Sequence, residues 1–288
     1  MTDKLTVKYH GEKVGTLSLT PDNRLCAFEY DREWLAEGFS VSPLELPLKP
    51  GLFIAKPKPF YGNFGIFEDS LPDGYGRYLL HRALMREGIW LVKFRHTYDP
   101  MDMGLQEFHY NEVAKRCGIN VTDFKLTAGK YFTTRRFDIT EDGERIHTTT
   151  AGGLLCVSLS EPVLDYSNLM ALTGYLTQNP KDVEEMYRRM VFNYLTDNKD
   201  DHCKNFSFLV RKDDAGKWKW HLAPAYDLTL CAEGYNGQHA TSVNQTGFPT
   251  LTDFIAAGTK TKMSEKRCRE IFDEVYGNCG DLLLNDIR

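Results

Sequence analysis

Carboxylate and amide side chains gather in two short segments, 200–205 and 225–227. Asp200 and Asn205 are five positions apart, and Asp227 ends the second segment. In kinases, an aspartate orients the attacking hydroxyl, an asparagine at this same spacing binds Mg²⁺, and a further aspartate holds the metal that bridges the phosphates. Mg²⁺ prefers hard oxygen ligands, which these side chains supply. The spacing therefore predicts Asp200, ahead of Asp201, as the catalytic base, and Asn205 and Asp227 as metal ligands.

The aspartate pair has a simpler interpretation, in which it is only the solvated end of the preceding helix. Taken alone, the pair is equally compatible with that role. Carboxylates at a helix C-terminus are disfavoured by the helix dipole, however, so a cluster there needs compensation, and a metal ion is one candidate. The matching positions of Asn205 and Asp227 favour the metal site.

A single lysine interrupts the apolar run 90–94, and the helical segment that follows it begins with Glu107. Kinases place a lysine on a strand against the α- and β-phosphates, and a helix glutamate positions it. Lys93 and Glu107 fit these two nucleotide-binding roles. A lone lysine in a strand is more often an edge-strand or snorkelling residue, so the pattern alone is a weak indication.

Three further side chains are candidates on the nucleotide side of the site. His202 would be a metal ligand or, with better support, an architectural histidine that bridges backbone groups of the catalytic loop. Arg135 and Phe137 belong to a strand that would leave the nucleotide-binding part and meet adenine. An ordinary exposed strand with an aromatic anchor explains the same residues equally well.

The composition limits the classes of protein that the chain can be. With 288 residues and 42% hydrophobic composition, it can bury a substantial core. The net charge of -5 argues against a surface built to bind nucleic acid by itself. The chain shows neither a signal-peptide core nor an apolar run near the ~20 residues that span a bilayer, so we expect a soluble, cytoplasmic protein without a membrane partner. Seven scattered cysteines without a C-x-x-C pair are expected to be reduced thiols.

Hydrophobic periodicity predicts the elements that would position these residues. The first half reads as mostly sheet, with a hairpin over 5–19, a strand over 131–137 and one or two helices, at 78–86 and from Glu107 to a C-cap at Gly118. The second half reads as helices over 168–176, 183–195 and 263–275, with a hairpin over 206–222. We predict an α+β chain with a β-rich N-terminal subdomain (1–60), a nucleotide-binding part (61–150) and a helical C-terminal lobe (151–288).

The motifs, in their order along the chain, resemble those of the HipA family of toxin kinases. The matching segments are 68–77, 90–94, 136–138, 198–208 and 222–228. The segments around 200–205 and 224–227 are specific, the others are supportive, and together they extend over nearly the whole chain. The resemblance implies a two-lobed protein-kinase-like fold that binds ATP and Mg²⁺ between its lobes and phosphorylates Ser or Thr of a protein.

The resemblance also implies partners and residue roles. Asp200 is similar to the family's catalytic aspartate, and Asn205 and Asp227 are similar to its Mg²⁺ ligands. Lys93 is similar to the phosphate-contacting lysine, and Arg135 with Phe137 to the adenine-side hinge. The family's targets include aminoacyl-tRNA synthetases. Its usual partner is a small helix-turn-helix antitoxin that binds operator DNA, so DNA contact would be indirect.

The chain departs from the family pattern at one junction. Members normally carry several tens of residues, including a glycine-rich phosphate-covering loop, before the strand that starts at Trp90. Here residues 87–89 run directly into Trp90, which leaves less room than a helix-to-strand connection usually has. We interpret the junction as an omission or deletion at 89/90, and a true deletion would remove backbone amides that cradle phosphates.

Three hypotheses follow from these observations. The first is an ATP-dependent Ser/Thr kinase that acts as a toxin. The second is a catalytically silent, kinase-like scaffold that binds an antitoxin or another protein. The third is a metal-dependent phosphohydrolase with two metals held by the aspartates and His202, which the kinase spacing disfavours.

Overall fold

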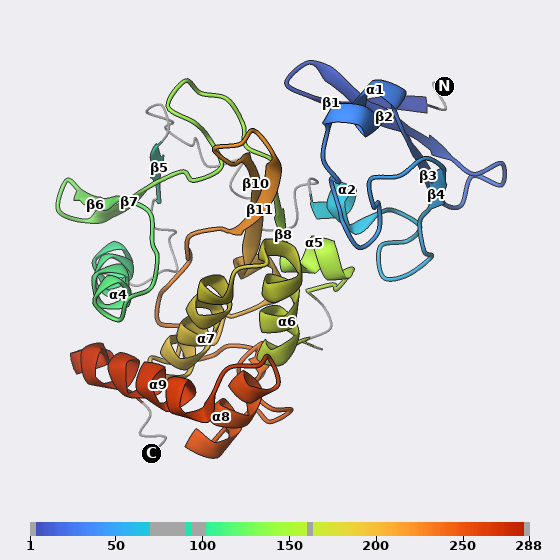
Figure 1. Cartoon of the computed structure of the whole chain (residues 1–288). Coiled ribbons are helices and arrows are strands. Elements are labelled where there is room, and N and C mark those ends of the chain that lie inside the picture. The colour runs from blue at the N-terminus through green and yellow to red at the C-terminus, as the bar shows by residue number, and fades with distance from the viewer. Residues whose placement is uncertain (1–3, 70–89, 94–101, 160–163, 285–288) are drawn as a thin grey trace.

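The computed structural model describes residues 4–69, 90–93, 102–159 and 164–284. Its strands and helices form a β-rich N-terminal part, a small sheet with one helix, and a mainly helical C-terminal part (Figure 1). The predicted helix at 78–86 lies outside the described residues. The junction at 89/90 lies at their edge, because residue 89 is outside and residue 90 is described. Among the described residues, no helix is long and apolar enough to cross a membrane.

The N-terminal part is an antiparallel sheet in the order β1-β2-β3-β4 with one short helix. Its elements are β1 (Lys4–Tyr9), β2 (Glu12–Leu19), β3 (Cys26–Tyr30), α1 (Arg32–Glu37) and β4 (Leu52–Ile54). The predicted first hairpin is confirmed. Only His10 and Gly11 separate its strands, and both have positive φ, which a two-residue hairpin turn requires to match the twist of the strands.

The middle part places a helix against a three-stranded antiparallel sheet of order β5-β7-β6. Its elements are β5 (Trp90–Val92), α4 (Met103–Arg116), β6 (Phe124–Thr127) and β7 (Tyr131–Arg135). The prediction that the helix begins at Glu107 is wrong, because α4 begins one turn earlier, after the N-cap Asp102. Gly104 in its first turn weakens the helical signal there. Gly118 follows the helix end with φ +76°, as expected of a C-terminal glycine.

The C-terminal part is built mainly from four helices. These are α6 (Tyr166–Thr177), α7 (Pro180–Leu195), α8 (Leu251–Thr259) and α9 (Glu265–Cys279). Local sequence sets their starts: the N-cap side chains of Asp165, Asn179 and Ser264 accept backbone N–H groups, and Pro180 opens α7. The helix α8 was not predicted from the sequence.

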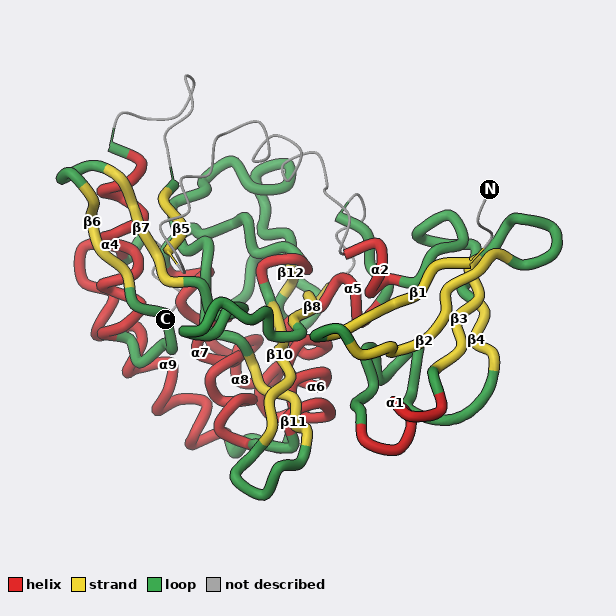
Figure 2. Tube along the Cα trace, turned by 90° about the horizontal axis from the view of Figure 1, so that it is seen from above, coloured by secondary structure: helices red, strands yellow, loops and turns green. Residues whose placement is uncertain are grey.

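Short strands and helices connect these parts. Strands β8 (Thr148–Thr150), β10 (Ser207–Lys212) and β11 (Trp218–Leu222) form one antiparallel sheet, and β9 (Leu164–Asp165) pairs in parallel with β12 (Thr241–Ser242). The short helices are α2 (Gly65–Asp69), α5 (Ala151–Leu155), η1 (Cys203–Asn205) and η2 (Gly280–Leu282). The hairpin β10–β11 lies between the N-terminal sheet and the unit of α4, β6 and β7 (Figure 2). The loop of residues 196–206 leads into this hairpin, and we call it the catalytic loop after its predicted role.

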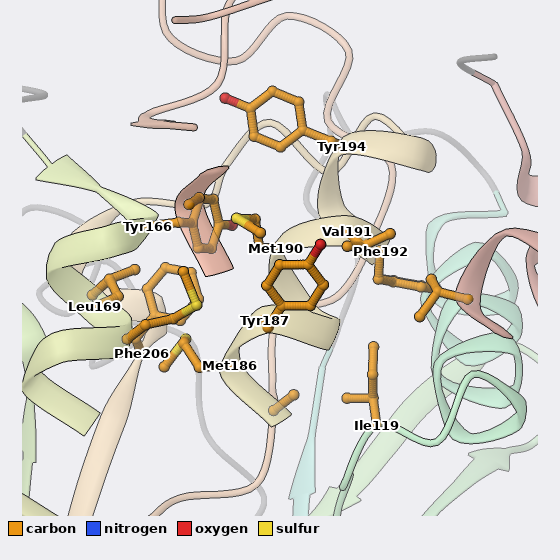
Figure 3. Packing of buried hydrophobic residues seen from close by; sticks show 14 of the residues in the cluster. Ile119, Tyr166, Leu169, Met186, Tyr187, Met190, Val191, Phe192, Tyr194 and Phe206 are labelled. Atoms are coloured by element: carbon orange, nitrogen blue, oxygen red, sulfur yellow. The ribbon is translucent and has the colours of Figure 1, made fainter. Parts of the chain in front are cut away.

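The central helix of the larger core is α7. Its buried side chains, including Met186, Tyr187 and Met190, pack beside Leu169 of α6 and Phe206 (Figure 3). All seven cysteines are free thiols, and four of them are buried: Cys117, Cys203, Cys268 and Cys279. The core anchors the C-terminal end of α7, from which the loop of residues 196–206 departs.

An aromatic cluster joins the N-terminal sheet to the β10–β11 hairpin. His147 contributes to it: Nε2 donates a hydrogen bond to the carbonyl oxygen of Val41 at 3.0 Å, and its ring packs on Phe39 and Trp220. Burial lowers the pKa of His147 to about 4, although the hydrogen bond to Val41 opposes the shift. The imidazole therefore stays neutral in the folded protein at pH values where the unfolded chain takes up a proton.

This histidine should make the folded state sensitive to mild acid. Between its ordinary pKa of 6.5 and its folded value of about 4, the unfolded state binds more protons, so stability falls as the pH decreases. We expect the free energy of unfolding to fall by about 2 kcal/mol between pH 7.5 and pH 5, and most of this decrease to be absent in His147→Gln. Urea denaturation at a series of pH values measures it. The exposed His221→Gln is the matched control, and an equal pH dependence in wild type and His147→Gln would contradict the assignment.

Candidate active site

A lysine with two carboxylate partners marks the first half of the site. Nζ of Lys93 contacts Oε1 of Glu107 at 2.6 Å and also contacts a carboxylate oxygen of Asp227. Lys93 lies directly after β5, and its backbone N–H donates to the carbonyl oxygen of Phe132 in β7 at 2.9 Å. Glu107 lies one turn into α4 and is buried. The sheet and the helix therefore fix the lysine between a helix glutamate and an aspartate from the C-terminal part.

The charges of this cluster stabilise one another. Burial alone would lower the pKa of Lys93, but the carboxylates of Asp227 and Glu107 outweigh it and raise the pKa. Burial raises the pKa of Asp227, but the charge and hydrogen bond of Lys93 lower it below its usual range. Burial raises the pKa of Glu107, and the charge of Lys93 offsets this rise only in part. Lys93 and Asp227 are therefore both charged at neutral pH.

Asp227 is positioned by its neighbours rather than by a regular strand. Ala225 forms a parallel bridge with Val121, and its N–H donates to the carbonyl oxygen of Asn120 at 2.8 Å. The hydroxyl of Tyr226 donates to the carbonyl oxygen of Lys204 at 2.5 Å, which connects this segment to the catalytic loop. Asp227 itself has φ +53°, a conformation that residues other than glycine adopt mainly where the surroundings impose it.

The catalytic loop presents Asp200 to solvent. Its side chain is 57% exposed, and Nε2 of His202 lies 3.7 Å from its Oδ1 atom. Nδ2 of Asn205 donates to the backbone carbonyl of Asp200 at 2.6 Å, which fixes the loop. Burial raises the pKa of Asp200, and the nearby charges of Asp227 and Asp201 add to the rise while His202 opposes it. A raised carboxyl pKa improves a general base for a neutral hydroxyl.

Asp201 has the opposite environment, with a fully buried side chain. Its carboxylate accepts hydrogen bonds from the hydroxyl of Tyr166 at 2.8 Å, Nδ1 of His239 at 2.9 Å, and the backbone N–H groups of Ala240 and Thr241 at 2.8 and 3.2 Å. With four donors around it, this carboxylate holds segment 239–241 against the catalytic loop. Asp201 is a positioning residue, and Asp200 is the carboxylate that remains accessible.

Removing the Asp201 carboxylate should destabilise the fold more than removing its neighbour. Asp201→Ala leaves several buried donors without an acceptor, and we expect the free energy of unfolding to fall by about 3 kcal/mol. Asp200→Ala, at the adjacent exposed position, is the matched control and should change it by less than about 1 kcal/mol. Urea denaturation at neutral pH compares the two variants. Equal stability losses would show that the buried carboxylate does not hold the loop.

The structure brings most of the other predicted residues near this centre. The ring of Phe137 packs on Tyr226, next to Asp227, with ring centroids 5.5 Å apart. The His202 ring faces Asp200, and its Nδ1 atom is buried without a hydrogen-bond partner among the described residues, so the predicted bridge to loop backbone is not what the ring makes. Arg135 is the outlier: its guanidinium pairs with Glu141 and Asp123, away from Lys93.

The oxygen donors needed for Mg²⁺ converge on a small cavity of about 10 Å³. Asp200, Asn205 and Asp227 all line it. The amide nitrogen of Asn205 is used by the loop, whereas its amide oxygen accepts none of the hydrogen bonds found in the described residues. One or two carboxylates with an amide oxygen suit Mg²⁺, which takes its remaining ligands from water and phosphates. No cluster of three His, Cys, Asp or Glu side chains suited to a metal occurs in the described part of the chain.

Sequence reasoning missed a buried chain of polar groups behind the loop. Nδ2 of Asn198 donates to Oδ1 of Asn193 at 2.9 Å, and Nδ2 of Asn193 donates to the hydroxyl of Tyr166 at 2.8 Å. Tyr166 in turn donates to Asp201, so the chain joins the end of α7 to the catalytic loop. The only sequence signal was that two asparagines, five positions apart, occur at the end of an apolar helix.

Comparisons with known proteins cover nearly the whole chain. The model of the HipA-like C-terminal domain matches residues 76–282, and the model of the HipA N-terminal domain matches residues 5–90. No curated protein sequence matches the chain.

Solved structures that are similar to the chain include a HipA protein and a kinase. HipA of Shewanella oneidensis MR-1, determined with HipB and its operator DNA, has 16% sequence identity and a TM-score of 0.68, and the match covers 99% of this chain and 92% of that one. The Helicobacter pylori proinflammatory kinase CtkA has 15% identity and a TM-score of 0.41, with 67% and 87% covered. The first match supports the predicted α+β, kinase-like fold of two lobes. Because the C-terminal family model alone covers most of the chain, the protein belongs to the HipA family.

Proposed function

We propose that the protein is an ATP-dependent Ser/Thr protein kinase that acts as the toxin of a HipA-type toxin–antitoxin system. The observation that carries the proposal is the Lys93 cluster. Lys93 joins Glu107 of α4 to Asp227, and Asp227 lines the same cavity as Asp200 and Asn205. Kinases require this combination of a glutamate-held lysine, a metal-binding aspartate and asparagine, and a catalytic aspartate.

The proposed reaction assigns one task to each group. Lys93 would contact the α- and β-phosphates, and Phe137 would lie on the adenine side. Asp200 would accept the proton of a protein hydroxyl as its oxygen attacks the γ-phosphorus and the bond to ADP breaks. Mg²⁺ held by Asn205 and Asp227 would neutralise charge on the phosphates. His202, close to the Asp200 carboxylate, would orient the base.

The phosphohydrolase hypothesis loses support from the environment of Asp201. Two-metal hydrolysis would need this carboxylate as a ligand, yet four protein donors already surround it and it is buried. A silent scaffold would retain ATP binding without transfer. No contact among the described residues favours it over the kinase, and the experiment below separates the two.

The partners follow from the family. Shewanella HipA was solved with HipB and operator DNA, and we propose that this chain likewise binds a helix-turn-helix antitoxin, with DNA contacted through that partner. The acceptor would be a hydroxyl of a cytoplasmic protein, and an aminoacyl-tRNA synthetase is our candidate. The net charge of -5 agrees with an indirect role in DNA binding.

Label transfer from ATP tests the proposal. The purified protein is incubated with ATP labelled in its γ-phosphate, Mg²⁺ and a cell lysate, with and without excess EDTA. We expect Mg²⁺-dependent label on serine or threonine of one or a few lysate proteins. ATP binding without any transfer would replace the kinase by the silent scaffold.

A further inference from the structure

A second cavity opens beside the catalytic loop. Its volume is about 150 Å³, and Asp200 and His202 line one wall. Apolar side chains from three segments form much of the rest: Val157, Leu164 and Cys203. Lys93, Phe137, Asn205 and Asp227 are not among the described residues that line it.

Asp200 is shared by this cavity and by the small cavity of the proposed metal site. It is therefore the group between the phosphate side and the second cavity. In-line transfer places the attacking hydroxyl opposite the leaving ADP, within hydrogen-bond reach of the base. A chain that delivers its hydroxyl to Asp200 must approach from a side that the nucleotide leaves open. The second cavity reaches Asp200 without being lined by Asn205 or Asp227, the predicted metal ligands.

The charges of the cavity wall indicate which kind of side chain, acidic, basic or apolar, the cavity can bind. Nζ of Lys199 is already held by the carbonyl oxygen of Ala232 at 3.2 Å and lies 3.5 Å from Oδ1 of Asp197. The lysine is therefore poorly placed to bind an acidic residue. Asp200 itself repels one, and the apolar side chains would desolvate a basic one. An apolar side chain is the group that this lining stabilises by removing its surface from water.

The part of the wall that contains Gly234, Tyr235 and Ala240 is held by hydrogen bonds. Segment 239–241 is fixed on Asp201, and residues 233–238 form a tight turn in which Tyr235 and Gln238 exchange backbone hydrogen bonds of 2.9 and 3.0 Å. Tyr235 and Ala240 of this segment both line the cavity. Because one buried carboxylate positions both this wall and the Asp200 loop, the cavity keeps a fixed distance from the base.

We propose that this cavity is a specificity pocket for an apolar side chain of the protein acceptor, one or two residues from the phosphorylated hydroxyl. The inference rests on the proposed kinase function and names the class of acceptor sequence. Consecutive Cα atoms are about 3.8 Å apart, so a side chain of an adjacent or next residue reaches a pocket that shares Asp200 with the hydroxyl.

The test maps acceptor sites on peptides. A dephosphorylated, protease-digested cell lysate is incubated with the full-length protein, ATP and Mg²⁺, and new phosphosites are identified by mass spectrometry. We expect Leu, Met, Phe or Val to be enriched roughly tenfold over Asp, Lys or Gly at one fixed position near the hydroxyl. Phosphosites without such enrichment would contradict the proposed specificity pocket but not the proposed kinase activity. No phosphosites at all would remove the kinase proposal, and the pocket with it.

A variant that fills the cavity separates direct recognition from loss of structure. Ala240→Leu should shift the preference at that position toward Ala and Val by about tenfold, because the larger wall residue leaves less room. The substitution keeps the hydrogen bond from the backbone N–H of position 240 to the Asp201 carboxylate. Ala215→Leu in the exposed β10–β11 turn is the matched control and should keep the wild-type preference. Equal preferences in both variants, with thermal unfolding midpoints like that of wild type, would contradict the proposal.

Discussion

Replacing Asp200 by Asn is expected to lower the turnover of phosphoryl transfer by about 10²- to 10⁴-fold, the usual contribution of a positioned general base. An amide of the same shape cannot accept the hydroxyl proton. Because the side chain is 57% exposed and accepts no hydrogen bond from the described residues, the fold should be retained. Single-turnover transfer from labelled ATP measures the rate, and circular dichroism checks the fold.

The loss should appear in kcat and much less in KM for ATP, since Asp200 acts on the acceptor side. Asp214→Asn, an exposed aspartate in the β10–β11 turn, is the matched control. If Asp200→Asn had near wild-type turnover, Asp200 would not be the general base.

The second large effect is expected at Asp227. Asp227→Asn should abolish most of the Mg²⁺-dependent part of ATP affinity and lower transfer by at least about 10²-fold, because the metal loses its charged ligand. The lowered pKa of Asp227 beside Lys93 keeps this carboxylate ionised well below neutral pH, so a metal ion bound there would meet a charged ligand. Calorimetric titration with ATP, in Mg²⁺ and in EDTA, measures the difference.

In wild type, EDTA should weaken ATP binding clearly, and in Asp227→Asn the two titrations should nearly coincide. Asp142→Asn, exposed in the turn after β7, is the control and should respond to EDTA like wild type. An Asp227→Asn protein whose ATP affinity still depends on Mg²⁺ would show that the metal is held elsewhere.

The parts of the site that the sequence predicted are those with a short, fixed spacing. Asp200 and Asn205 share one loop, and Asn205 does bond back to Asp200 there. Lys93 and Glu107 were weak candidates alone, and their contact depends on α4 packing beside the β5–β7 sheet. Their roles in binding and catalysis remain predictions.

Other features could not be predicted because their partners are distant in the chain. The carboxylate of Asp201 is satisfied by Tyr166, His239 and the segment after it, more than thirty residues away on either side. In the local sequence, the two aspartates differ only in their spacing from Asn205, which is five positions for Asp200 and four for Asp201. Arg135 was assigned to the hinge on its position in a strand, and only the fold shows that it pairs with acidic neighbours instead.

The division of the chain also depends on tertiary pairing. The boundary near residue 150 was placed where the sequence changes character, yet β8 pairs with β10 and so joins the hairpin that follows the catalytic loop. Helix α2, in the predicted middle part, packs on α5. Short elements such as these carry little periodicity, and long-range contacts determine where they lie.

The most direct test of the account follows the γ-phosphoryl group itself. ATP carrying ¹⁸O in its γ-phosphate is incubated with the protein, Mg²⁺ and a cell lysate, and heavy phosphate is located by mass spectrometry. With wild type we expect heavy phosphate on serine or threonine of a protein, and little with Asp200→Asn. Heavy phosphate found only as the free ion, or no consumption of ATP at all, would contradict it.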